Sequence, residues 1–474
     1  MVHTKNNPFT TLTNATYGFL PTLSRDLGSR RLGLRKNFIW TALGNLSAGG
    51  TQVLILCLIA QNISKDAVGQ YALALAIINP LLAFLSLQLR SMLASQSDQE
   101  CDVQICISLR LATNAIAALI VLAIIFSGKT ESLASIVLAL TVLKLFVAIS
   151  DVFYGQMQRR ERMDFIAKSQ LVSGFLQIAS FAAVSYLTGS LLVACCAMAV
   201  APMLTLWLYD LPVSRALEVG HGVGVSGSLL PRWDFATMTH LAWVTLPLGL
   251  VTGVVALTAS IPRYYLGHYW EIGAVGVFAA LACPGLVLQQ SMLSLSQAAL
   301  PRFGHCFVNA DGAGCRRLLW RVLIVNAVFG VLGVLAGLLI GRQILQLLYT
   351  EEFAQYDQPL VWMMVSFALN CMGSIGSVLM AAKRFRTQFV ISLITLVTTV
   401  GLGVMLIPRY GLTGAALTLV VVSSIRLAVI FLAVSFVIRE MELPDNDTVN
   451  RGVRESSPGH PQAASRPHRI QWQK

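Results

Sequence analysis

Charge is scarce in this chain of 474 residues. Only 12% of the residues are Asp, Glu, Lys or Arg, whereas an ordinary soluble domain is roughly a quarter charged. Hydrophobic residues make up 55% of the chain, and they recur in apolar runs of ~20 residues, the length at which a helix crosses the ~30 Å hydrocarbon core of a bilayer. The composition therefore excludes one large soluble domain and predicts an all-α polytopic membrane protein.

Motifs for cofactor or metal chemistry are also lacking. The nine cysteines form no CxxC pair, and the seven histidines form no HExxH motif and no cluster, so we expect neither a metal site nor a cofactor. The stretch GVGVSG at 222–227 matches GxGxxG, but no strand precedes it and Pro231 follows where a helix should continue. A dinucleotide site needs a strand, turn and helix, and we interpret this stretch as a linker.

Twelve apolar spans can be drawn along the chain, and the longest interruption divides them into six and six. They are 38–61, 70–94, 105–127, 132–153, 167–187, 190–209, 238–262, 273–299, 318–341, 359–382, 388–407 and 412–438.

The distribution of basic residues tests this predicted topology, because cytosolic segments of membrane proteins are enriched in Lys and Arg. With the N-terminus inside, 27 of the 34 Lys and Arg residues fall on inside segments and 5 on outside segments. The bias predicts that both termini are cytosolic. It also accounts for the net charge of +12 without nucleic acid as a partner.

The two sets of six spans resemble each other. AVGQYALALA (67–76) opens the second span and AVGVFAALAC (274–283) opens the eighth, and each is followed by a proline within the helix. YLTGSLL (186–192) joins spans five and six as YGLTGAAL (410–417) joins eleven and twelve. Each pair is six spans apart in the same orientation, which predicts two parallel six-helix lobes around a central cavity, a common transporter architecture.

The predicted organisation has five parts. They are a basic cytosolic segment (1–37), an N-lobe (38–209), a cytosolic linker (210–237), a C-lobe (238–438) and a polar, Pro-rich tail (439–474). The first part has no apolar segment with a cleavage site, so we do not expect a cleaved signal peptide there. The tail is predicted to be disordered in the cytosol.

Four cations fall within the spans. Lys144 and Arg426 lie near the centres of spans four and twelve, and Arg90 and Arg110 lie one to two turns from the cytosolic side. A charge at the bilayer centre costs ~3 kcal/mol or more, and intramembrane charges mark substrate or ion pathways. One interpretation is that carbonyl groups or Asp151 satisfy these cations; the other is that they line a hydrated cavity for an anionic cargo.

Asp151, seven residues after Lys144, is the one acid placed clearly inside a span, and it is a candidate proton-coupling site or a partner of its basic neighbours. Uncharged polar residues within the spans favour a hydrated interior. They are Asn45, Gln52, Asn79, Gln88, Gln289, Gln290, Gln297 and Asn370. From these we take Lys144, Arg426, Arg90 and Arg110 as candidate cargo-binding cations. Asn45, Gln52, Gln289 and Gln290 are the candidate cargo-binding amides.

The chain resembles the Wzx-type oligosaccharide flippases of the multidrug/oligosaccharidyl-lipid/polysaccharide superfamily over about residues 36–438. The resemblance rests on the order and spacing of NFIWTALGNL, AVGQYALALAIINPLLAFLSLQLRSMLA, ISDVFYGQMQRRERMD, GVFAALA and PRYGLTGAALTL. It implies two lobes in a V, alternating access, and transfer of a lipid-pyrophosphate-linked oligosaccharide to the outer leaflet. The implied location is the bacterial inner membrane, and the implied partners are membrane lipids, the polysaccharide polymerase and the chain-length machinery.

Two alternatives remain. An ion-coupled drug exporter of the same superfamily would favour several intramembrane carboxylates, and this chain has one against four cations. A membrane polymerase or ligase for the same glycans should carry a large outer loop, and none of the predicted outer loops is long enough to fold as a domain. The sequence therefore favours a flippase over an enzyme.

Overall fold

A computed structural model describes residues 33–95, 102–127, 133–220, 229–309, 311–349, 351–376, 378–379, 382 and 384–442, and these residues are helical with short connections. The elements of the first half are α3 (Leu34–Asn62), α4 (Lys65–Leu85), α5 (Leu89–Ser95), α6 (Val103–Phe126), α7 (Ala134–Arg159), α8 (Met163–Thr188), α9 (Leu191–Thr205), the π-helix η2 (Leu206–Asp210) and α10 (Leu211–Gly220). Those of the second half are α11 (Phe235–Tyr269), α12 (Ile272–Val308), α13 (Gly312–Leu348), α14 (Glu351–Ala354), α15 (Asp357–Met372), the 3₁₀ helix η3 (Gly373–Gly376) and α17 (Phe385–Glu442).

Side-chain caps begin several of these helices. Ser64, Asp102, Asp234 and Asp311 each accept a hydrogen bond from a backbone N–H in the first turn of α4, α6, α11 and α13. Such caps satisfy donors that have no partner within the helix. Hydrogen bonds from Thr237 also hold the pKa of the exposed Asp234 carboxyl below its usual value.

The described residues of the predicted spans are mostly helical, although span 70–94 is interrupted. By length and composition, nine helices of the described residues are long and apolar enough to cross a membrane. One of these runs over 54 residues, Arg386–Arg439, and covers two predicted spans. Gly411 interrupts it with φ 55° and ψ −126°, a conformation that favours glycine because it has no Cβ. The chain is a multi-pass membrane protein.

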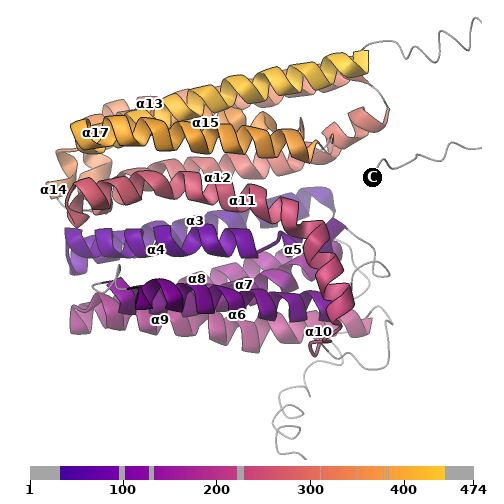
Figure 1. Ribbon diagram of the computed structural model, residues 1–474, viewed down its shortest axis with the longest axis horizontal. Helices are drawn as coiled ribbons and strands as arrows, with labels where there is room; N and C mark the ends of the chain where they lie inside the picture. Colours follow the sequence, from indigo (N-terminus) through magenta and orange to yellow (C-terminus); the bar gives the residue numbers. More distant parts are fainter. Residues whose placement is uncertain are drawn as a thin grey trace, which may run out of the picture.

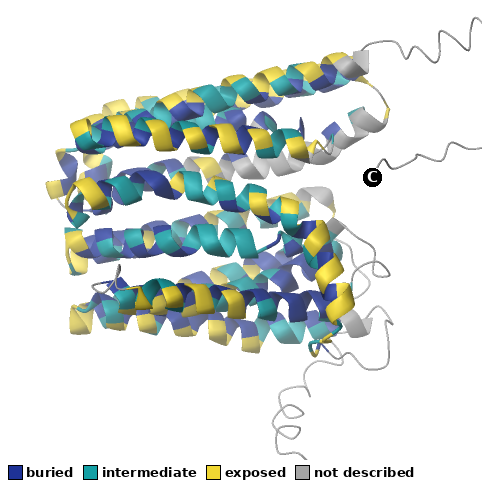
Figure 2. Ribbon diagram, in the orientation of Figure 1, coloured by how far each residue is buried: buried dark blue, intermediate teal, exposed yellow. Residues whose placement is uncertain are grey.

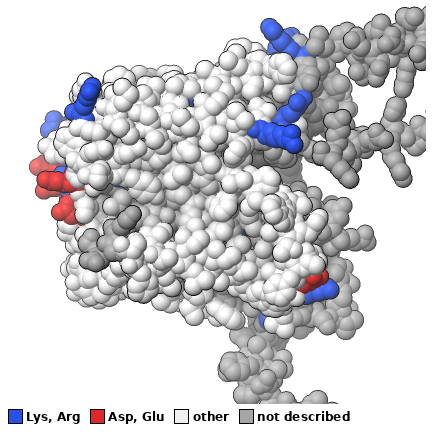
Figure 3. Space-filling view, viewed as in Figure 1, with Lys and Arg blue, Asp and Glu red and all other residues white. Residues whose placement is uncertain are grey.

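The surface is apolar over a broad belt. Large hydrophobic side chains are exposed on the outer helices, among them Leu119, Phe126, Leu339 and Leu347 (Figure 2). On the face shown in Figure 3, charged side chains gather at the two ends of the molecule and are absent from its middle. Exposed apolar surface of this extent is incompatible with water and suits contact with lipid.

Equivalent helices pack alike in the two halves, which lie one above the other in Figure 1. In the first half α3 packs against α8, α6 against α7, and α7 against α9. In the second half α11 packs against α17, α13 against α15, and α15 against α17. Across the boundary, α4 contacts α11 and α12, and α12 contacts α3. This pattern supports the predicted parallel repeat.

Two glycines of the repeated AVG motif meet where the halves join. Gly69 of α4 lies against the backbone of Ile272, and a Cβ on Gly276 of α12 would stand 2.8 Å from the nitrogen of Gly69. Small residues let helices approach this closely. The motif found twice in the sequence therefore packs against its own copy.

The second predicted span, 70–94, is interrupted. α4 ends at Leu85 and α5 begins at Leu89, and between them Leu87 and Gln88 have positive φ of 49° and 51°. Left-handed conformations are uncommon for such residues, and the apolar sequence carries no glycine here to indicate the break. The predicted linker 210–237 overlaps α10 and the start of α11, and residues 221–228 of it lie outside the described residues.

Candidate functional site

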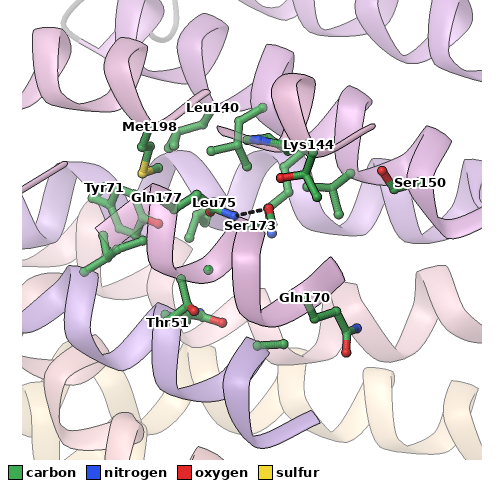
Figure 4. A pocket seen from close by; sticks show the side chains of 18 of the residues that line it. Thr51, Tyr71, Leu75, Leu140, Lys144, Ser150, Gln170, Ser173, Gln177 and Met198 are labelled. Carbon is green, nitrogen blue, oxygen red and sulfur yellow. Dashed lines mark hydrogen bonds between the residues drawn. The ribbon is translucent and has the colours of Figure 1, made fainter. Parts of the chain in front are cut away.

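A cavity of about 180 Å³ lies within the first half and is lined by residues of α3, α4, α7, α8 and α9. Its polar lining residues are Thr51, Gln52, Tyr71, Lys144, Ser150, Tyr154, Gln170, Ser173, Gln177 and Thr205. Figure 4 shows many of these side chains around the hollow. The predicted cavity between the two lobes is a different feature and remains a prediction.

Lys144 projects from α7 into this cavity. Among the described side chains that line the cavity, Lys144 alone carries a charge. Its ammonium group has no hydrogen-bond or ion-pair partner within the part of the chain that the structure describes. Because a buried charge is costly unless it is paired, Lys144 offers a binding group to an anion that enters the cavity.

Amide and hydroxyl groups line the same cavity as Lys144. Gln52 comes from α3, while Gln170, Ser173 and Gln177 lie on one side of α8, and Nε2 of Gln177 donates to Oγ of Ser173 at 3.1 Å (Figure 4). Amides and hydroxyls both donate and accept hydrogen bonds, as recognition of sugar hydroxyls requires. Gln52 was predicted from the sequence. The α8 residues were missed, although their i, i+3, i+7 spacing marks one helix face.

Arg90 and Arg110 belong to a separate cluster with Asp151. Nη1 of Arg90 lies 3.2 Å from Oδ1 of Asp151, and Nη2 of Arg110 lies 3.8 Å from Oδ2. The Arg90 guanidinium also lies over the ring of Tyr154, 5.6 Å from its centroid. Asp151 is roughly 10 Å further along α7 than Lys144, at 1.5 Å per residue, and it contacts the two arginines instead of Lys144.

Arg426 lies in the second half, away from this cavity. Nη1 of Arg426 donates to Oδ1 of Asn370 at 3.3 Å, and Nδ2 of Asn370 donates to Oγ of Ser423 at 2.8 Å. The hydroxyls of Ser366 and Ser423 are 3.0 Å apart. These four residues of α15 and α17 form a polar cluster in which the cation is paired.

The remaining predicted residues are dispersed. Asn45 is half-buried on α3 and has a partner, but it does not line the cavity. Gln289 is exposed on α12, and the side chains of Gln290 and Gln297 lie outside the described residues. The structure thus brings Lys144 and Gln52 together and separates them from Arg426 and from the Arg90–Asp151–Arg110 cluster.

Asp210 is an acid that the sequence analysis placed at the border of the linker. It lies in η2, within an apolar helical stretch that runs from Leu191 to Leu217, and its side chain is buried. Its carboxylate accepts a hydrogen bond from Ser169. The predicted sixth span ended at residue 209, because a charged residue follows the apolar run. The sequence alone therefore did not reveal that the helix continues past Asp210.

Metal ligands are not clustered in the part of the chain that the structure describes. No group of three His, Cys, Asp or Glu side chains there is suited to hold a metal ion. Among its described side chains the cavity presents one ammonium group together with amide and hydroxyl groups, a set of groups suited to an anionic polar ligand.

Known proteins resemble this chain in sequence and in fold. A family model described as "Polysaccharide biosynthesis protein" matches residues 34–307, more than half of the chain. The capsular polysaccharide biosynthesis protein CapF of Staphylococcus aureus is 24% identical over 390 residues, which are 81% of this chain and 95% of CapF.

Solved structures of similar fold are transporters. The lipid II flippase MurJ, in an inward closed conformation, gives a TM-score of 0.67 at 13% identity, with 90% of this chain and 94% of MurJ covered. An outward-facing multidrug resistance MATE family transporter of the MOP superfamily gives 0.62 at 15% identity, with 87% and 97% covered. These likenesses confirm the resemblance to the superfamily at the level of the fold. The chain belongs to the polysaccharide biosynthesis protein family and has the fold of the MOP-superfamily transporters.

Proposed function

We propose that this protein is a flippase that moves polyprenyl-pyrophosphate-linked oligosaccharide from the cytosolic to the outer leaflet by alternating access. The observation that carries the proposal is the unpaired ammonium group of Lys144 in a cavity lined by amides and hydroxyls. A pyrophosphate is multiply charged and must cross a low-dielectric core, where an opposite charge stabilises it strongly. The family and the fold support a transporter of this class.

The cavity size indicates which part of the cargo it receives. A volume of about 180 Å³ is below the ~300–1,000 Å³ of pockets that enclose drug-sized ligands. It suits a pyrophosphate with part of the first sugar. The remaining sugars then occupy space that opens between the halves, and the polyprenyl chain stays in lipid.

The proposal includes a topology and a location. Twelve spans with both termini in the cytosol agree with the bias of basic residues, and the membrane is the bacterial cytoplasmic membrane. The two lobes are residues 38–209 and 238–438, and they rock against each other. A polysaccharide polymerase and chain-length proteins act on the delivered units.

A drug exporter with the same fold is the second candidate, favoured by the likeness to MATE family transporters. The described cavity lining argues against it, because Lys144 repels an organic cation and the lining carries no acid within the described residues. A membrane polymerase or ligase is less consistent with a fold shared with transporters.

Proteoliposomes with the purified protein and a fluorescent polyprenyl-pyrophosphate glycan test the proposal. An enzyme confined to one side of the membrane reports glycan that arrives from the other side. Protein-dependent arrival is expected, and Arg426→Met serves as a matched cation variant outside the cavity. No arrival of the glycan, together with export of a fluorescent organic cation by the same vesicles, would refute the flippase and favour the exporter.

A further inference from the structure

Asp210 is a buried acid connected to the cavity. Its side chain is 0% exposed, as is that of Ser169, and Tyr154 lines the cavity. Oδ2 of Asp210 makes no hydrogen bond of good geometry among the described residues, although the hydroxyl of Ser150, which also lines the cavity, is a close neighbour of the carboxylate. Burial of a carboxylate without a cation is costly, and π-helical turns such as η2 frequently occur at functional sites.

A chain of hydrogen bonds leads from this acid to the cavity wall. Oγ of Ser169 on α8 donates to Oδ1 of Asp210 at 2.6 Å, and the hydroxyl of Tyr154 on α7 lies 2.8 Å from Oγ of Ser169. Three elements, η2, α8 and α7, therefore contribute one group each. We call Asp210, Ser169 and Tyr154 the acid relay.

The protonation state of Asp210 determines which group donates and which accepts in each hydrogen bond of the relay. A serine hydroxyl has one proton, so when Ser169 donates to ionised Asp210 it must accept from Tyr154. Tyr154 then presents only lone pairs to the cavity. When Asp210 is protonated on the oxygen that faces Ser169, every bond reverses: Asp210 donates to Ser169, Ser169 donates to Tyr154, and the Tyr154 proton is free to point into the cavity.

Protonation through the relay produces this reversal. A proton from the cavity binds to the Tyr154 oxygen, the former Tyr154 proton moves to Ser169, and the former Ser169 proton moves to Asp210. Each O–H bond that breaks is replaced by one that forms, and the net change is one added proton. No other reactant is needed.

We propose that the acid relay makes binding of an anionic cargo depend on a proton, because protonated Asp210 turns the hydroxyl of Tyr154 into a hydrogen-bond donor toward the cavity. The inference rests on the proposed function, since the anion that accepts the hydrogen bond from Tyr154 is the pyrophosphate bound at Lys144. Asp210 and Ser169 are positioning residues, and Tyr154 is the group that contacts the cargo. Asp210 is thus a second candidate for ion coupling beside Asp151.

The cations near the relay are paired with other acids. The Arg90 guanidinium lies over the Tyr154 ring and pairs with Asp151, and Arg162 pairs with Asp164 at 2.9 Å. Neighbours that interact electrostatically or by hydrogen bonding with relay residues are Ser150, Asp151, Arg90 and Tyr209. The cations among these neighbours are paired with other acids, so Asp210 has no guanidinium or ammonium partner among the described residues.

Binding of farnesyl pyrophosphate by the purified full-length protein tests the relay between about pH 5 and about pH 8, the range in which carboxyl groups of buried sites titrate. The probe itself titrates there, so the compared quantity is the ratio of wild-type Kd to variant Kd at each pH. Asp210→Asn keeps a donor beside Ser169 at every pH, and Tyr154→Phe removes the final donor. Ser169→Ala frees the tyrosine from the acid. Glu271→Gln, an exposed acid far along the chain, is the control.

The expected ratio for Asp210→Asn is about one at acidic pH and rises to about ten at alkaline pH, the value of a hydrogen bond to a charged group. Tyr154→Phe should bind about tenfold more weakly at acidic pH and like wild type at alkaline pH. Ser169→Ala should give the same Kd ratios as Asp210→Asn. It is a smaller change and replaces Asp210→Asn if that variant does not fold. Glu271→Gln should follow wild type throughout.

Two results would overturn the inference. One leaves the proposed flippase function standing, and the other overturns that function as well. If wild type binds the probe and all relay variants keep its pH dependence, the relay is wrong while the flippase proposal stands. If wild type binds no farnesyl pyrophosphate at any pH, the anion site fails and the proposed function falls with the relay.

Discussion

The two halves of this protein pack their helices alike but treat their intramembrane cations differently. In the first half, Lys144 faces a cavity and has no partner within the described residues. In the second half, Arg426 donates to Asn370, which two serines support. A repeated architecture therefore does not impose a repeated site. The cation without a partner lines a cavity, whereas the other cation is hydrogen-bonded to an amide where α15 and α17 meet.

Removal of the Lys144 charge should have the largest effect. We expect Lys144→Met to weaken farnesyl pyrophosphate binding about thirty- to a hundredfold and to abolish flipping, because an ion pair out of water contributes about 2–3 kcal/mol. Lys144→Arg should retain part of the binding, and Arg426→Met should bind like wild type. Equal losses in Lys144→Met and Arg426→Met, measured on folded protein by titration, would contradict the difference between the halves.

Asn370→Leu should reveal the structural role of the second cation. The change leaves the half-buried Arg426 without its acceptor, and we expect about 2 kcal/mol less stability, within the cost of leaving a buried hydrogen-bonding group unsatisfied. The double variant Asn370→Leu with Arg426→Met should regain most of the lost stability, because it leaves no buried charge without a hydrogen-bond acceptor. Thermal unfolding in detergent measures this cycle, and strict additivity of the two changes would show that the pair does not interact.

Asp151→Asn distinguishes pairing from proton coupling in the first half. Asp151 is the shared partner of Arg90 and Arg110. Solvent screens its pair with Arg90, since both are about one-third exposed, but Arg110 is only 3% exposed and would lose its carboxylate. We therefore expect Asp151 to contribute about 2 kcal/mol of stability. Flipping driven by a pH gradient should persist in the folded variant. Loss of the response to the gradient, with flipping intact in its absence, would instead identify Asp151 as the coupling acid.

The smallest effect is expected for the amides of the cavity. Gln177→Leu removes one hydrogen-bonding group beside Ser173, and we expect about a threefold to tenfold weaker binding of a sugar-bearing probe. Binding of farnesyl pyrophosphate, which has no sugar, should be unchanged. A matched loss with both probes would indicate that Gln177 contacts the pyrophosphate, not the sugar.

Sequence reasoning located the helices well because the bilayer requires long apolar runs. It selected Lys144 and Gln52, which line the cavity, because polar groups are rare within apolar spans. It left pairing of Arg90 and Arg110 with Asp151 as one of two interpretations. Pairing across helices depends on packing, and the periodicity of an all-apolar span does not reveal which faces meet. It also missed Asp210 and the break at Leu87 and Gln88, where no glycine or proline indicates the local geometry.

The contact of Gly69 with Gly276 has a consequence for which residues these two positions tolerate. In a symmetric dimer of a six-helix chain, one glycine would face its own copy across the twofold axis, an isologous contact. In this protein the equivalent contact joins two positions of one polypeptide, so the size of each residue limits the other. Because a Cβ at either position would meet backbone of the opposite half, a bulky side chain there acts first on the contact between the halves.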